Sequence, residues 1–468
     1  MKSAILTASF IFSGYLSAQI LPYQHFTERT RDKKDSSSLQ YFFRTGEFYG
    51  HARYFFMATD NEAGLSDYFA NAFGMGIGYE TAKLKGFQIG ISGFFIYNLW
   101  SSDLAVADPK TGAKNRYEMG QFDVMDPKNK HDMDRLEDLY IKYTFRKNHI
   151  KLGKQHIKTP FINPQDGRMR PTLVEGLMFE SAQLKKFKFE GGLLWGVSPR
   201  GTVKWFGIGE SMGIFPAGLN PDGTKSGYVG NTHSKYIQFL GTTYRPTEQV
   251  KIQAWNFHIH NVLNSSLLQI DINKKIGEKT EFFSALQAIS QFTVGSGGNV
   301  LPAKSYANKN ANSLTFGSKL GIRKENWVYQ VNYNRITDNG RYLMPREWGR
   351  DPFFTFMSRE RNEGMCNTRA LTAGVIRTFG KSGFKSELIA GYFKLPDVKD
   401  AARNKYAMPS YAQINADLRY LFGGFLKGLE LQMLYVYKMN WGETYGNQQY
   451  IINKTNMSLY NVVINYHF

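Results

Sequence analysis

One repeating unit runs through this chain from about residue 48 to its end: two alternating runs joined by a short turn, then a longer polar connection. In the run 87–98 the odd positions are mostly apolar, and the even positions include Gln88, Ser92 and Asn98. The runs 138–146 and 314–323 alternate in the same way. Because successive side chains of a β-strand point to opposite faces, each run is predicted to be a strand with one apolar and one polar face.

The lengths of the connections narrow the choice of fold. About eighteen runs fall in the even-numbered range of bacterial outer-membrane barrels, whose periplasmic turns are short and whose external loops are long. A soluble sandwich or propeller, the main alternative, has shorter strands and no such bias between its connections. We therefore expect an all-β fold, a transmembrane antiparallel β-barrel. The expected short turns are 83–86, 146–149, 185–188, 245–249, 277–279, 324–326, 380–383 and 423–427, and the expected long loops are 60–70, 99–135, 155–173, 198–232, 260–264, 293–312, 337–366, 395–408 and 440–456.

Composition agrees with a barrel. A hydrophobic fraction of 42% is too low for a helical membrane protein, and 15% aromatic residues is too high for a disordered chain. Tyrosine and tryptophan near strand ends, as in 327–329 and 435–437, are suited to the membrane–water boundary. The final run, 459–468, alternates and ends on Phe468, as a closing strand of a bacterial barrel does. The single cysteine, Cys366, excludes an intrachain disulfide.

The first residues have the pattern of an export signal. Lys2 precedes an apolar run from Ala4 to Tyr15, and a cleavage position follows Ala18. The apolar run is too short to span a membrane as a helix. We therefore expect a signal peptide at 1–18, an N-terminal periplasmic segment at 19–47 and the barrel at 48–468.

The stretch TPFINPQDGRMRP, residues 159–171, interrupts the alternation with three prolines, an Asp-Gly pair and two arginines. Proline fixes φ and removes a backbone donor, so this segment cannot continue a strand. Irregular backbone at membrane depth is tolerated where it lines a water-filled cavity. The stretch is therefore predicted to fold into the lumen and narrow a pore, with an ordinary surface loop as the alternative.

Two motifs resemble the OprD family of outer-membrane porins. The first runs from Leu152-Gly-Lys-Gln155 through the proline stretch to Glu175-Gly176. The second is Trp348-Gly-Arg-Asp-Pro-Phe-Phe-Thr-Phe356 with Arg359-Glu-Arg-Asn-Glu-Gly364. The resemblance implies a monomeric or loosely trimeric channel of eighteen strands, in the bacterial outer membrane. It also implies a narrow eyelet lined by the third and seventh external loops, with basic side chains along one wall.

From these arguments we expect passive, charge-selective diffusion of small polar solutes such as amino acids, short peptides and carboxylates. No cofactor is expected, and the partners are the solutes, outer-membrane lipid and the barrel-assembly machinery. The charges expected at the constriction are Asp166, Arg168, Arg170, Arg350, Asp351, Arg359, Glu360 and Arg361, and the cations expected on the strand wall are Lys142, Lys319, Arg323 and Arg419.

Other functions find less support in the sequence. An outer-membrane hydrolase needs a base beside a nucleophile, and the nine histidines show no link to a motif serine. A structural or adhesive barrel is a further alternative. His258 and His260 share a strand face, but no third metal ligand is evident. The formal charge of +19 is spread over lumen and turns, which argues against one nucleic-acid-binding face.

Overall fold

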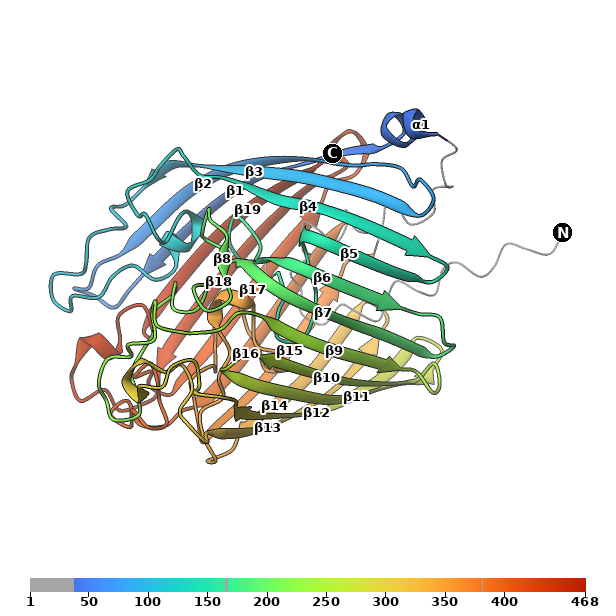
Figure 1. The fold of residues 1–468 in the computed structure, drawn as a ribbon. Coiled ribbons are helices and arrows are strands. Elements are labelled where there is room, and N and C mark those ends of the chain that lie inside the picture. Colours follow the sequence, from blue (N-terminus) through green and yellow to red (C-terminus); the bar gives the residue numbers. More distant parts are fainter. Residues whose placement is uncertain (1–37, 165–166, 381) are drawn as a thin grey trace.

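A computed structural model describes residues 38–468, apart from 165, 166 and 381 (Figure 1). The expected signal peptide at 1–18 lies outside the described residues, as does most of the segment 19–47. The helical elements are α1 (Leu39–Arg44), η2 (Glu118–Gln121), η3 (Pro302–Lys304), η4 (Arg346–Trp348), η5 (Gly424–Leu426) and η6 (Gln448–Tyr450). The strands are β1 (Glu47–Asp60), β2 (Tyr68–Glu80), β3 (Phe87–Ser101), β4 (Asp134–Phe145), β5 (Asn148–Gln155), β6 (Leu173–Ser181), β7 (Phe187–Ser198), β8 (Phe206–Gly207), β9 (Ile237–Tyr244), β10 (Val250–Ile259), β11 (Leu263–Gly277), β12 (Thr280–Thr293), β13 (Asn312–Lys324), β14 (Trp327–Ile336), β15 (Thr368–Thr378), β16 (Phe384–Lys394), β17 (Tyr411–Leu421), β18 (Leu429–Asn440) and β19 (Met457–His467).

The sheet closes on itself. Every wall strand pairs antiparallel with its neighbours in the chain, and β1 pairs with both β2 and β19. The two-residue β8 pairs only with β7 and belongs to the fourth loop, so 18 of the 19 strands form the wall. The predicted antiparallel barrel of about eighteen strands is confirmed.

The chain ends at the closing seam. The backbone of Gly50 in β1 exchanges two hydrogen bonds with the backbone of Phe468, at 2.9 and 3.1 Å. A Cβ atom on Gly50 would lie 2.1 Å from the Phe468 ring, so only glycine fits beneath the terminal ring. The aromatic C-terminus is therefore packed against the first strand.

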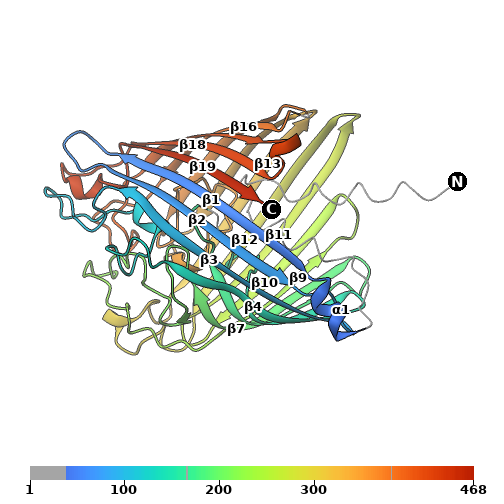
Figure 2. The same ribbon diagram turned by 90° about the horizontal axis from the view of Figure 1, so that it is seen from above.

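The alternation of the sequence appears as two faces of the wall. Leu139 and Ile141 of β4 point outward, with 45% and 51% of their surfaces exposed, whereas Asp138 and Tyr140 face inward and are buried. The short turns gather at one end of the barrel and the long loops at the other (Figures 1 and 2). In the part of the chain that the structure describes, no helix is long and apolar enough to cross a membrane.

Loops fill part of the barrel interior. Ile162 of the third loop (156–172) and Trp348 of the seventh loop (337–367) belong to an apolar cluster with Ile237 and Phe257 of the wall. A second cluster buries Met119 of the second loop (102–133) with wall residues of β1, β3, β18 and β19. These apolar contacts hold loop backbone inside the barrel, and the second loop joins the two loops that were expected there.

Candidate pore constriction

The third and seventh loops are joined by their backbones. The amide nitrogen of Asn163 donates to the carbonyl oxygen of Trp348 at 3.0 Å. The Asn163 side chain donates to the carbonyl oxygen of Arg350 at 3.1 Å and accepts from the Arg350 amide at 3.0 Å. Gly349 lies between them with φ at 144°, and a Cβ atom there would be 2.6 Å from Asn163. The two loops therefore meet too closely for any residue other than glycine at this position.

The seventh loop is also fixed to separate parts of the wall. Gln287 of β12 donates to the carbonyl oxygen of Pro352 at 3.1 Å. Farther round the barrel, Gln413 of β17 donates to the carbonyl oxygen of Ser358 at 2.8 Å. Lys438 of β18 donates to the next carbonyl oxygen in the loop, that of Arg359, at 2.6 Å. The loop is thus held at two separated parts of the wall.

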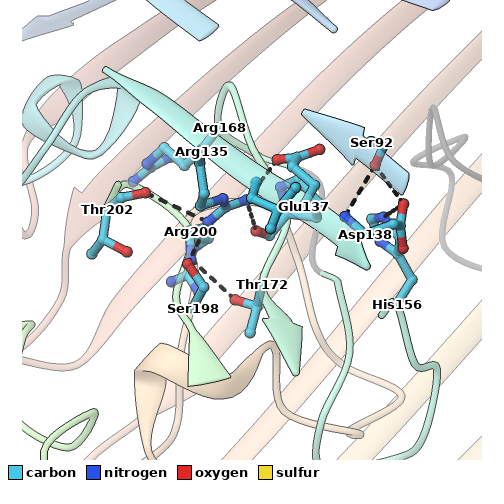
Figure 3. Close-up of polar contacts among 12 residues, drawn as sticks. Ser92, Arg135, Glu137, Asp138, His156, Arg168, Thr172, Ser198, Arg200 and Thr202 are labelled. Carbon is cyan, nitrogen blue, oxygen red and sulfur yellow. Dashed lines mark hydrogen bonds and ion pairs between the residues drawn. The ribbon is translucent and has the colours of Figure 1, made fainter. Parts of the chain in front are cut away.

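Arg135 of β4 fixes the end of the third loop (Figure 3). One of its terminal nitrogens donates to Glu137 at 2.8 Å and to the carbonyl oxygen of Pro171 at 3.0 Å. The other donates to the hydroxyl of Ser198, where the fourth loop (199–236) begins, at 3.0 Å. A single buried arginine therefore connects the third and fourth loops to the wall.

Three of the arginines expected at the constriction lie close together. Burial, the neighbouring Arg359 and, to a smaller extent, Arg361 lower the pKa of Arg168 to about 9, while Glu118 acts in the opposite direction. Such a shift arises when positive charges share a partly desolvated space. The meeting point of the third and seventh loops is therefore a region of positive potential.

Hydrogen bonds to neutral groups hold two of these guanidinium groups. Arg359 donates to the carbonyl oxygen of Gly167 at 3.0 Å and to the side-chain oxygen of Asn461 at 2.6 Å. Arg361 donates to the carbonyl oxygen of Gly349 at 2.7 Å. Because these acceptors are neutral, these particular bonds fix the positions of the guanidinium groups without adding a negative charge.

Arg168 and Arg170 differ in their surroundings, although an extended segment would place them on one face. Arg170 is 2% exposed and lies 5.8 Å from the centre of the Phe94 ring of β3. Arg168 is less buried, and its side chain passes beside Gly120 of the second loop. The segment bends between them, so Arg170 packs against the wall while Arg168 stays near the arginines of the seventh loop.

Asp351 and Glu360 are less accessible than four of the five expected arginines, Arg170 being the buried one. Asp166 lies outside the described residues. Asp351 and Glu360 of the seventh loop are 2% and 4% exposed, and each accepts a backbone hydrogen bond within that loop, from Asn362 and Met357. Burial and the neighbouring Asp351 raise the pKa of Glu360 to about 8. The Glu360 carboxyl is therefore harder to ionise than an exposed glutamate.

The four cations expected on the wall lie on strands as predicted, but they differ in their partners. The Lys319 ammonium lies 4.6 Å from the centre of the Phe354 ring in the seventh loop. The other three pair with carboxylates of the inward face: Lys142 with Glu80 at 4.0 Å, Arg323 with Glu281, and Arg419 with Asp417 at 3.1 Å and Glu430 at 3.8 Å. Of these four cations, Lys319 thus contacts the seventh loop.

Two further cations, which were not predicted from the sequence, contact this region. Arg53 of β1 donates to the carbonyl oxygen of Arg168 at 2.7 Å. Arg200 of the fourth loop has its pKa lowered by burial and by Arg361 and Arg168, and it donates to the carbonyl oxygen of Arg346 at 2.8 Å. The alternation of β1 already assigns Arg53 to the inward face, but nothing in the local sequence marks Arg200.

A hollow open to solvent lies between the seventh loop and the wall formed by β14 to β18. Arg350, Phe354 and Phe356 line it from the loop, and Glu387 and Asp417 line it from the wall. The Arg350 guanidinium is 5.3 Å from the centre of the Phe356 ring. The hollow thus offers a cation, aromatic faces and carboxylates to a solute.

Two features bear on chemistry other than transport. Ser92 donates to Asp138 at 2.7 Å, and His156 lies 3.5 Å from the same carboxylate oxygen (Figure 3). The carboxylate lies between the hydroxyl and the imidazole, whereas a hydrolytic triad has the imidazole in the middle. Within residues 38–164, 167–380 and 382–468, no three histidine, cysteine or acidic side chains form a metal-binding group.

More than half of the chain matches the model of one known protein family. Residues 102–357, which include the third loop and the first two thirds of the seventh loop, match the family described as outer membrane porin, OprD family. This chain belongs to the OprD family. It is therefore a bacterial outer-membrane porin, a channel for small polar solutes. No curated protein matches the chain.

Solved structures of OprD-type barrels share the fold. The crystal structure of Pseudomonas aeruginosa OpdK with vanillate is 13% identical, with a TM-score of 0.70, and the match covers 91% of this chain and 99% of that one. P. aeruginosa OccK9 (OpdG) is 15% identical with a TM-score of 0.72 and the same coverage. Acinetobacter baumannii OccAB2 is 14% identical with a TM-score of 0.70, over 92% of this chain and 99% of that one.

Proposed function

We propose that this OprD-family porin is selective by charge and favours small carboxylates and zwitterions, including amino acids and short peptides. The observation that carries the proposal is the convergence of Arg168, Arg359 and Arg361 where the third and seventh loops meet. Fixed cations in a narrow pore attract anionic groups and raise the barrier for cations. A carboxylate can accept two parallel hydrogen bonds from a guanidinium group, which adds geometric selectivity.

The hollow beside the seventh loop supports the zwitterion part of the proposal. Arg350 on one side and Glu387 and Asp417 on the other provide charges of both signs. Phe354 and Phe356 provide apolar contact for a side chain or ring. OpdK, a structural neighbour, was crystallised with vanillate, a carboxylate. A carboxylate that passes the arginines would therefore meet a polar and aromatic surface.

Liposome swelling tests the proposal. Purified protein is reconstituted, and uptake is compared among solutes of similar size: a neutral sugar, a monocarboxylate, a dicarboxylate, a zwitterionic amino acid and a monovalent organic cation. We expect the carboxylates and the zwitterion to enter faster than the sugar, and the cation to enter more slowly. Equal rates for all solutes of one size would contradict charge selectivity while leaving the porin function intact.

We also propose how the chain is exported and assembled, and that it has no catalytic activity. Residues 1–18 act as a signal peptide, 19–47 form an N-terminal periplasmic segment, and residues from 48 onward form the barrel. The chain works as a monomer or loose trimer and is inserted by the barrel-assembly machinery. It works without a cofactor. We propose no catalytic activity, because the Asp138 carboxylate lies between the Ser92 hydroxyl and the His156 imidazole, whereas a hydrolytic triad needs the imidazole beside the hydroxyl. Asp166 remains a proposed constriction residue together with the arginines.

A further inference from the structure

Three cations lie side by side on the outer surface of the barrel. Arg335 of β14 is directly opposite Arg369 of β15, and Arg369 is directly opposite Lys394 of β16. Residues in such register share one face of a sheet. We call Arg335, Arg369 and Lys394 the cationic row.

The row faces away from the lumen. The next row on the same face, two residues along each strand, is Tyr333, Leu371 and Tyr392, which are 38%, 49% and 39% exposed. Alternation of side chains places the cationic row on that same outward face. It lies at the loop end of the strands, which is the external end of an outer-membrane barrel.

An apolar band separates this row from the opposite end of the strands. Beyond the tyrosine row the outward residues are Val331, Ala373 and Ala390, then Tyr329, Val375 and Leu388, and then Trp327, Arg377 and Ser386. From Arg335 to Trp327 the chain advances eight residues, which is about 27 Å along the strand and roughly 20 Å along the membrane normal at a typical tilt. The apolar band of such barrels is about 25 Å tall, so the backbone of the cationic row lies near the external edge of the band, and its long side chains reach the level of the external lipid headgroups.

The row lacks acidic neighbours on its own face. Its neighbour on β13 is Phe316, and the outward residues of β17 nearest to it are Ala412 and Ile414. Arg369 and Lys394 are exposed and have no hydrogen-bond or ion-pair partner among the described residues. Asp338, an acid near Arg335, is bound by Arg403 at 2.6 Å.

Arg335 is held in place by neutral acceptors. It donates to the side-chain oxygen of Asn367 at 2.6 Å and to the carbonyl oxygen of Thr368 at 3.4 Å. Like charges directly opposite each other destabilise a sheet. An anion that lies against the row offsets this repulsion.

We propose that the cationic row binds the phosphate groups of an anionic lipid in the outer leaflet of the outer membrane. The acyl chains of that lipid would lie along the apolar band below the row. Tyr392 and Trp441, whose rings meet edge to face at 5.7 Å, border the headgroup level on one side. Phosphate groups are strong hydrogen-bond acceptors and pair well with both arginine and lysine. The inference concerns the outer surface and is independent of the solute that the pore prefers.

A binding experiment with paired variants tests the proposal. The test variant carries Arg369→Gln and Lys394→Gln and leaves Arg335 with its hydrogen bonds. The control variant carries Lys324→Gln and Arg377→Gln, which removes two cations from the opposite end of the strands β13 and β15. Folding of both is verified by the heat-dependent shift on gels and by channel conductance. Binding of a diphosphorylated glycolipid and of its dephosphorylated form is then measured in neutral detergent.

A basic side chain near an anionic lipid surface contributes about fivefold in affinity, so two contribute about 25-fold. We expect the test variant to bind the phosphorylated lipid about 25-fold more weakly, the control to bind it like the native protein, and the difference to shrink in 1 M salt. Equal binding by the test variant, or equal binding of both lipid forms, would overturn the proposal. Equally tight binding of inorganic phosphate alone would overturn the lipid assignment. If the double variant fails to fold, Lys394→Gln alone should lose about fivefold.

Discussion

Replacing Arg168 with methionine is the most direct test of the constriction. Among the described residues, the side chain of Arg168 donates only to its neighbour's carbonyl oxygen, that of Gly167, whereas its backbone carbonyl oxygen accepts from Arg53. Arg168→Met therefore removes one charge and keeps the backbone contact that fixes the loop.

The size of the effect follows from Coulomb's law. A charge about 6 Å from a passing ion contributes about 0.7 kcal/mol at a dielectric constant of 80 and about 2.8 kcal/mol at 20. Because the charge acts on anions and cations with opposite sign, about 0.7 kcal/mol per ion changes the ratio of anion to cation permeability by about 1.4 kcal/mol, which is about tenfold. Under a tenfold salt gradient this moves the reversal potential by about 40 mV towards cation selectivity, about two thirds of the roughly 59 mV that ideal selectivity gives.

The assay is the reversal potential of single channels in a planar bilayer. Arg377→Met is the matched control, because it removes one positive charge from the outward face of β15. We expect the control to leave the reversal potential within a few millivolts of the native value, since screening acts within about 8 Å at physiological salt. If Arg168→Met keeps the native reversal potential and conductance, Arg168 does not line the conducting path, and the assignment of the constriction is wrong.

Three further outcomes are expected. Deleting Phe468, or replacing Gly50 with valine so that the terminal ring is displaced, should reduce the amount of folded barrel in membrane fractions several-fold; normal levels would refute a role of this contact in closure. Glu360 has its pKa raised to about 8, so increasing the pH from 7 to 9 ionises it and should shift the reversal potential towards cations; the shift should be smaller in Glu360→Gln, and an equal shift would exclude Glu360 as its source. Asn163→Ala removes two hydrogen bonds between the loops, each worth about 1 kcal/mol, and should increase open-channel current noise; unchanged noise would show that these bonds do not limit loop motion.

The wall of the barrel could be predicted from the sequence because the direction of each side chain depends on its position along its own strand. Each strand alternates between lipid and lumen, so the inward position of Lys319 and the outward position of Leu320 follow from parity alone. Loop bounds followed from the same pattern: the seventh loop was expected at 337–366 and lies at 337–367. The prolines of the third loop marked it as unable to continue a strand, and that loop does lie inside the barrel.

The interior of the constriction could not be predicted in the same way. Arg168 and Arg170 are two positions apart, yet one stays near the arginines of the seventh loop and the other packs on Phe94. The second loop contributes to this difference, because the Arg168 side chain lies beside Gly120 of that loop. Residues Glu118 to Gln121 are buried, but the sequence there has no alternating pattern that would predict their burial. Contacts between segments far apart in the chain decide the positions of loop side chains, and a single sequence carries little information about such contacts.

The attachment of the seventh loop to two separated parts of the wall has a consequence for how this channel can diversify. Gln287, Gln413 and Lys438 hold the loop through its carbonyl oxygens, which every amino acid provides. Side chains at these three attachment points, Pro352, Ser358 and Arg359, can therefore be exchanged while the hydrogen bonds that fix the loop are kept. The wall and the loop backbone can therefore stay constant while loop side chains that line the pore change. New solute preferences can arise by such substitutions without changes in the wall.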